Sequence, residues 1–98
     1  MNLDLTAYTG NFNGMKFMLF AAKIVSEHDG ILNTRYSICV CVAGKPIREA
    51  SGFADLHTCQ CTLDYIAVCK GLRCIGANAV LPSYKVDSET GVLHNEPI

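Results

Sequence analysis

The residues of this sequence best suited to chemistry are soft metal ligands, which gather in two short segments. Cys39 and Cys41 alternate, so both sulfurs would lie on one face of a strand, and three further ligands follow at His57, Cys59 and Cys61. Their number suffices for a tetrahedral zinc site. Structural zinc sites usually pair ligands as C-x₂₋₄-C, and neither C-x-C pair has that spacing. We therefore expect no cofactor and small buried side chains as the main role of the cysteines. A zinc-stabilised binding module is the alternative.

A catalytic role would need a nucleophile with a positioned base, and His57 is the only histidine close in sequence to any cysteine. The sequence offers no third group that would orient this imidazole. The carboxylates are scattered over predicted loops and turns, and no segment combines glycines with the Lys-Ser/Thr pair of a phosphate-binding loop. The residues alone therefore predict a protein that is not an enzyme.

The hydrophobic pattern predicts the strands that must position these residues. Alternation from Leu3 to Tyr8 indicates a short strand, followed by a turn-rich loop over 9–14. The apolar segment 15–25 fits a buried strand, and a second helix over 14–28 is the alternative. The clearest strand is 35–43, with bulky side chains on one face and small ones on the other. A turn at 44–46 then leads into a returning strand over 47–53, which makes a hairpin.

The period becomes helical after the hairpin, and we expect the main helix over 58–75. Thr58 or Asp55 can cap its start, and Gly76 can end it. Gly71 would then lie inside the helix, so alanine at this position should cost little stability. An apolar stripe predicts the face that packs on the sheet, namely Cys61, Tyr65, Val68, Cys69, Leu72 and Ile75.

These elements predict an α+β fold, with a small antiparallel sheet of about four strands and the 58–75 helix packed on one face. The small face of 35–43 would let the helix approach closely. A last short strand is expected over 77–81, and the segment 87–98 has the composition of a tail that frays. A chain of 98 residues supports one hydrophobic core, so residues 1–98 form a single domain. An exposed sheet edge is expected, through which a homodimer could pair.

Composition narrows the class of protein and of partner. Half of the residues are hydrophobic and only 17% are charged, which is typical of a folded domain. Eight basic residues against nine acidic ones give a formal charge of -1, so the bulk charge predicts no nucleic-acid or anionic-lipid partner. No cation precedes Lys16, which argues against an export signal, and the apolar run 18–22 is too short to span a membrane. We expect a cytoplasmic protein with reduced thiols.

Residues 36–72 carry a pattern of residue types found in a known family. A strand, a tight turn and a strand containing Ser51-Gly52 precede Thr58 and a helical run from Asp64 to Leu72. This order resembles the ribonuclease H-like family. The resemblance implies a nuclease or nucleotide-binding domain in which several carboxylates hold two divalent ions. Only Asp64 matches one of these acids, and a metal-dependent nuclease using it is the alternative function.

The function that these observations favour is stoichiometric binding to another macromolecule, most simply a protein. Small single-domain proteins of this sort are common in phages and mobile elements, where they inhibit host enzymes or defence systems. Aromatic side chains dominate protein interfaces, and Tyr8, Phe12 and Tyr84 lie in or beside predicted loops. We expect these three residues to contribute to the binding surface.

Overall fold

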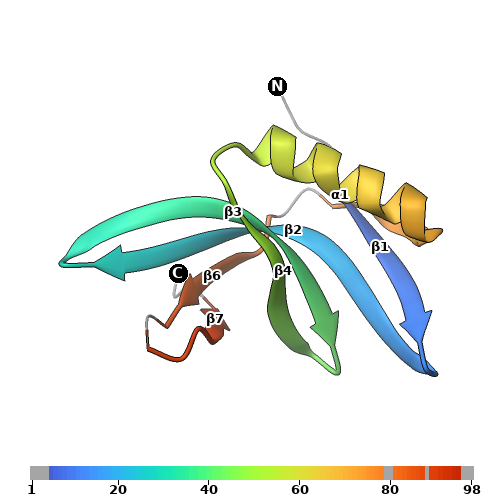
Figure 1. Ribbon diagram of the computed structural model, residues 1–98, viewed down its shortest axis with the longest axis horizontal. Helices are drawn as coiled ribbons and strands as arrows, with labels where there is room; N and C mark the ends of the chain where they lie inside the picture. Colours follow the sequence, from blue (N-terminus) through green and yellow to red (C-terminus); the bar gives the residue numbers. More distant parts are fainter. Residues whose placement is uncertain (1–4, 79–80, 88, 96–98) are drawn as a thin grey trace.

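The computed structural model describes residues 5–78, 81–87 and 89–95 (Figure 1). They form a compact α+β domain with one helix and seven strands. The elements follow in the order β1 (Leu5–Phe12), β2 (Met15–His28), β3 (Ile31–Val42), β4 (Lys45–Phe53), α1 (Leu56–Lys70), β5 (Arg73–Asn78), β6 (Ser83–Val86) and β7 (Leu93–Asn95). The predicted class is therefore confirmed, whereas the sheet is larger than the four strands expected.

The first four strands form a meander joined by three turns of two residues each. Both residues of every turn have positive φ, at Asn13–Gly14, Asp29–Gly30 and Ala43–Gly44. This backbone is the type I′ turn, whose twist matches that of the two strands it joins. The third turn begins one residue before the predicted 44–46 and ends at Gly44, so Lys45 and Pro46 already belong to β4. The first turn begins only at Asn13, so the predicted loop 9–14 is mostly strand.

The long strand β2 explains why the sheet has more than four strands. The sheet order is β4-β3-β2-β1-β5, and all of these pairs are antiparallel. β1 covers only the first part of the free edge of β2, between Met15 and Leu19. β6 pairs in parallel with Lys23–Val25 on the second part, and β7 pairs with β6. One edge of β2 thus holds two successive neighbours.

The alternative of a helix over 14–28 is wrong, because this segment is β2. Its run of buried side chains belongs to alternate faces of the strand, and both faces are covered. Leu19 and Ala21 lie in a core cluster under α1, whereas Phe20, Ala22 and Ile24 lie in a second cluster on the other face. A strand buried on both faces loses the alternation that would have distinguished it from a helix.

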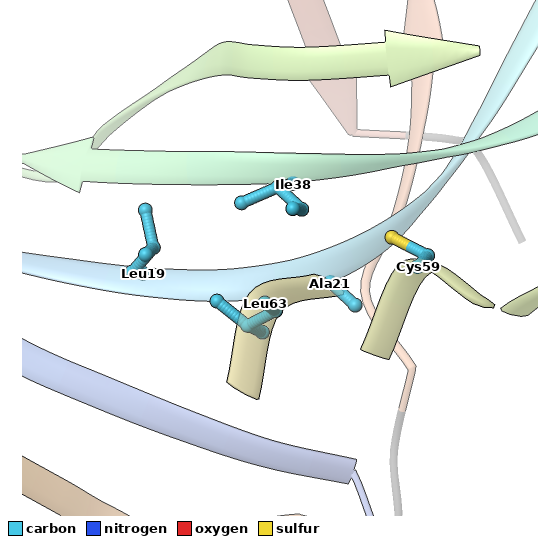
Figure 2. Packing of buried hydrophobic residues seen from close by; sticks show 5 residues of the cluster. All are labelled: Leu19, Ala21, Ile38, Cys59 and Leu63. Atoms are coloured by element: carbon cyan, nitrogen blue, oxygen red, sulfur yellow. The ribbon is translucent and has the colours of Figure 1, made fainter. Parts of the chain in front are cut away.

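The helix covers one face of the sheet, and Figure 2 shows the buried centre of that contact. Leu63 and Cys59 of α1 are 0% exposed and pack with Leu19, Ala21 and Ile38. The predicted helix face is wrong, because its members Tyr65 and Val68 are 70% and 79% exposed. Cys61 and Cys69 are exposed as well, and Ile75 lies beyond the helix in β5.

Both ends of α1 are set by capping residues. Asp55 is the N-cap and accepts a hydrogen bond from the backbone N–H of Thr58 at 2.9 Å, as one of the two predicted caps. This bond lowers the pKa of the Asp55 carboxyl. The helix ends at Lys70 and not at 75, because Gly71 adopts the left-handed conformation with φ +66°. Gly71 is therefore a helix stop rather than an interior residue.

The strands β6 and β7, which belong to the same sheet, contribute Tyr84, Val86 and Leu93 to the cluster on its opposite face. Cys39 lies in the cluster on this face with Cys41 packed against it, so the small face of β3 does not meet the helix. The helix packs instead on the bulky face, which carries Tyr36, Ile38 and Val40. Within the segment 87–98 the structure places β7, and its Leu93 is only 8% exposed.

The outermost strands of the five-strand path are β4 and β5. Pro46, which cannot donate a backbone hydrogen bond, lies on β4 as expected for an edge strand. The predicted last strand occurs earlier than expected, as β5 over Arg73–Asn78, and residues 79–80 of the predicted range are outside the described part. Among the described residues, no helix is long and apolar enough to cross a membrane.

Candidate functional site

An open apolar groove of about 660 Å³ lies between the C-terminal half of α1 and the ends of the first four strands. Ten of its eleven lining side chains are hydrophobic, and the exception is Lys70 in the last turn of the helix. The lining is formed by Phe12, Met15, Phe17, Leu19, Ile38, Val40, Val42, Ala50, Ile66, Lys70 and Leu72. Ligand-binding clefts in proteins are commonly of this size and are lined mainly by apolar groups.

The first hairpin places three apolar side chains along one wall of the groove. Phe12 and Met15 are cross-strand partners on either side of the Asn13–Gly14 turn, so they lie on the same face of the sheet. Phe17, two residues farther along β2, returns to that face. Because the turn pairs Phe12 with Met15, the apolar side chains of the two strands form one row on this face.

The floor of the groove depends on the missing side chain of Gly10. Phe17 is the cross-strand partner of Gly10 and its ring lies over the glycine. A Cβ at Gly10 would come within 2.5 Å of Phe17 Cζ and 2.7 Å of Leu72 Cδ2. Leu72, from the loop after α1, and Phe17, from β2, thus meet above Gly10 because no side chain separates them.

The groove is exposed enough to accept a ligand. Phe12 is 71% exposed and Met15 59%, although both are large hydrophobic side chains. Ile47 is 52% exposed and pairs with Val40 across β3 and β4, so it extends the apolar surface on the same face. Contiguous exposed apolar surface of this kind marks binding sites in soluble proteins.

Asp64 does not face the groove but ties the helix to β1. Its Oδ1 accepts a hydrogen bond from the Tyr8 hydroxyl at 2.7 Å and another from Gln60 Nε2 at 2.9 Å. Gln60 Nε2 also donates to the backbone carbonyl of Thr6 at 3.1 Å. Burial, together with the hydrogen bond to Asp64, raises the pKa of Tyr8 to about 12. Asp64 therefore has a structural role, in which it accepts two hydrogen bonds that hold α1 against β1.

The candidate zinc ligands are distributed over three places. Cys39 and Cys41 lie in the cluster to which β6 and β7 contribute, whereas Cys59 lies under the helix on the other face. Cys61 Sγ is 3.6 Å from His57 Nε2, but both side chains are exposed on the outer side of α1. Within the described ranges, no three His, Cys, Asp or Glu side chains are grouped so as to hold a metal ion.

The two buried thiols are poor nucleophiles in this fold. Burial raises the pKa of Cys39 to about 12 and that of Cys59 to about 11, because a buried thiolate would lose its hydration. All six cysteines are free of disulfide bonds. The packing of Cys39 and Cys59 agrees with a role as small hydrophobic side chains.

The three predicted binding aromatics lie in different environments. Phe12 lines the groove. Tyr8 packs against the cluster under α1 and is engaged with Asp64. Tyr84 lies on the opposite face, where its ring is tilted against that of Phe20 at 6.5 Å, and burial raises its pKa. The structure therefore does not bring the three aromatics together.

Of the groove residues, the sequence pattern indicates Phe12 alone as a binding residue. One signal was present, since apolar residues on both sides of Asn13-Gly14 predict a cross-strand pair if the turn has two residues. Ile66 and Leu72 could not be assigned to this surface, because their position depends on where the helix ends. Comparison with protein-family models, with curated proteins and with solved structures finds no match for this chain.

Proposed function

We propose that this protein is a stoichiometric binding protein that holds an apolar segment of a protein partner in the groove between α1 and the sheet. The observation that carries the proposal is the exposure of Phe12 and Met15 at the mouth of a cleft whose lining is almost wholly hydrophobic. Leaving this surface in water is unfavourable by roughly 25 cal/mol per Å², so a partner that covers it gains that free energy. The groove therefore supports binding rather than covalent chemistry.

The groove favours a protein segment because its polar groups are few. Among the described residues, Lys70 is the one charged residue in the lining, and it can fix one end of a ligand while the other contacts remain apolar. Short peptide segments bind such grooves through two or three apolar anchor side chains. Phe12 and Met15 are adjacent and would contact the same anchor.

The proposal can be tested with peptides selected from a displayed random library against the purified protein. Selected peptides should be rich in apolar side chains, and their dissociation constants can be measured by fluorescence polarisation. The double substitution Phe12→Ser/Met15→Ser should weaken binding at least tenfold, because each interface anchor contributes roughly 1–2 kcal/mol. Both side chains are exposed, so the fold should be retained.

The matched control is Tyr65→Ser, which removes an aromatic side chain that is 70% exposed but lies outside the groove. Peptide affinity should be unchanged in this variant. Equal loss of affinity in the control and in the groove variant, or no loss in either, would show that the groove is not the binding site.

A further inference from the structure

The tip of the β2–β3 hairpin, residues 26–33, is a second exposed apolar feature, at the far end of the sheet from the groove. Its two large hydrophobic side chains are Ile31, 70% exposed, and Leu32, 64% exposed. Figure 1 shows this hairpin extending to the left, whereas the ends of β1–β2 and β3–β4 point to the lower right. A molecule therefore cannot place its own hairpin tip in its own groove.

The charges of these two regions are opposite. The hairpin tip contains Glu27 and Asp29 and no lysine or arginine. The segments that border the groove, residues 11–17, 40–50 and 66–73, contain one acidic residue, Glu49, and five basic ones, Lys16, Lys45, Arg48, Lys70 and Arg73. Lys16 alternates with Met15 and Phe17, and Arg48 pairs with Cys39, so both lie on the opposite face and the lysines beside the groove are Lys45 and Lys70. Lys45 is the cross-strand partner of the groove residue Val42 and so lies on the same face. The net charge of the whole chain, -1, does not reveal that acidic and basic residues lie in different regions.

The carboxylate of Asp29 is available to a partner. Its side chain is 87% exposed, and its ion-pair contact among the described residues is with His28 at 3.6 Å, which is also highly exposed. Glu27 is partly engaged, because it lies 3.3 Å from Lys85 Nζ on β6. Asp29 is therefore the stronger candidate to meet a lysine at the groove.

The hairpin tip also has a suitable shape. Successive residues of a strand point to opposite faces, so Ile31 and Leu32 project from the two sides of the tip. The groove is lined by Ile66 and Leu72 from α1 and the loop after it, and by apolar side chains of the strands, Val42 among them. A narrow hairpin with one hydrophobic side chain on each side can contact the helix side and the strand side of this lining at once.

We infer that the groove receives the β2–β3 hairpin tip of a second copy of this chain. Ile31 and Leu32 fill the apolar lining, and Asp29 meets Lys70 or Lys45 at its edge. The contact is head-to-tail, so every bound pair leaves one tip and one groove free and can grow into a ring or an open chain. The inference rests on the groove being a binding site, as proposed above, and implies that a partner must displace the tip.

Analytical ultracentrifugation over a range from low micromolar to near-millimolar protein tests this contact. The natural protein should show a mass that increases with concentration. The tip variant Ile31→Ser/Leu32→Ser and the groove variant Phe12→Ser/Met15→Ser should each weaken self-association at least tenfold, whereas Tyr65→Ser should not change it. Circular dichroism and thermal unfolding confirm that the exposed substitutions preserve the fold.

Mixing the two variants distinguishes a head-to-tail contact from other dimers. The groove variant retains an intact tip, and the tip variant retains an intact groove, so an equimolar mixture should form a one-to-one heterodimer that grows no further. A dimer that pairs identical sheet edges would not be restored in this selective way. A natural protein that stays monomeric throughout, or a mixture that stays monomeric, overturns the inference.

Peptide binding separates the failure of this inference from that of the proposed function. The tip variant keeps the groove and should bind the selected peptides at least as tightly as the natural protein, because no second copy competes. If it binds them while the natural protein is monomeric, only the head-to-tail contact is refuted. If no peptide binds any variant while self-association depends on tip and groove, only the proposed partner binding is refuted.

Discussion

Replacing Leu63 by alanine tests which face of α1 holds the helix on the sheet. Leu63 is fully buried among Leu19, Ala21 and Ile38, so the substitution removes apolar contacts and leaves a cavity below the helix. Leucine-to-alanine changes at such sites cost roughly 2.7–5 kcal/mol. A domain of this length has a total stability of about 5–15 kcal/mol, so the variant should lose a large part of it.

Val68→Ala is the matched control on the same helix. Val68 belongs to the apolar stripe that the sequence pattern favoured, but it is 79% exposed. Its truncation should change stability by no more than about 0.5 kcal/mol, because exposed positions away from caps and clusters tolerate substitution. Alanine is also a better helix former than valine, which reduces the cost further.

Urea denaturation followed by circular dichroism measures both variants. For Leu63→Ala the midpoint should fall with an unchanged slope, and thermal unfolding should shift by roughly 4–8 °C for each kcal/mol lost. Equal midpoints for the two variants, or a greater loss for Val68→Ala, would show that α1 packs on the sheet through the face that carries Tyr65 and Val68.

Four further outcomes are expected. Gly71→Ala should cost about 1–2 kcal/mol in thermal unfolding, because φ is +66°, and a cost near zero would contradict the helix stop. Ala43→Asn should stabilise by about 1 kcal/mol, because Ala43 has φ +54° in a turn that favours Asn-Gly, and a lower midpoint would count against it. Alkylation without reductant should modify the three exposed cysteines quickly and all six only after unfolding. Burial raises the pKa values of Cys39 and Cys59 above the usual thiol value, so their contribution to the stability of the fold is complete below pH 9 and should be lost as pH rises through about 11–12. Purified protein should show no magnesium-dependent nuclease turnover, and turnover abolished by Asp64→Asn would support the ribonuclease H-like alternative.

The strand over 35–43 could be predicted because bulky and small side chains alternate along it and a turn follows, and it corresponds to most of β3. The strand β2 could not be distinguished from a helix, because both of its faces are buried and carry large apolar side chains. The strands β6 and β7 are added because β2 has room along one edge for both β1 and β6, whereas β5 pairs with the outer edge of β1.

The buried face of α1 could not be predicted because it contains polar residues. Gln60 is only 5% exposed, and Asp64 is half-buried beside it. Both are accommodated by hydrogen bonds to β1, which is more than 50 residues away in sequence. Hydrophobic periodicity does not take account of hydrogen-bond partners distant in sequence, so it predicted that the stripe containing Tyr65 and Val68 is buried. The groove could not be predicted from the sequence either, because its lining comes from four strands and the end of the helix, which come together only in the folded chain.

The three two-residue turns also determine how the chain can reach this fold. Each turn closes a short loop, so pairing from β1 to β4 needs contacts only between strands adjacent in sequence, and these form rapidly. In contrast, β5 pairs with β1 and β6 pairs with β2, and in both cases the paired residues are more than 50 positions apart in the sequence. The meander can therefore assemble first and act as a template on which the helix and the last three strands dock. Until they do, both faces of β2 are open to water, and the half-folded chain is at its most prone to aggregate.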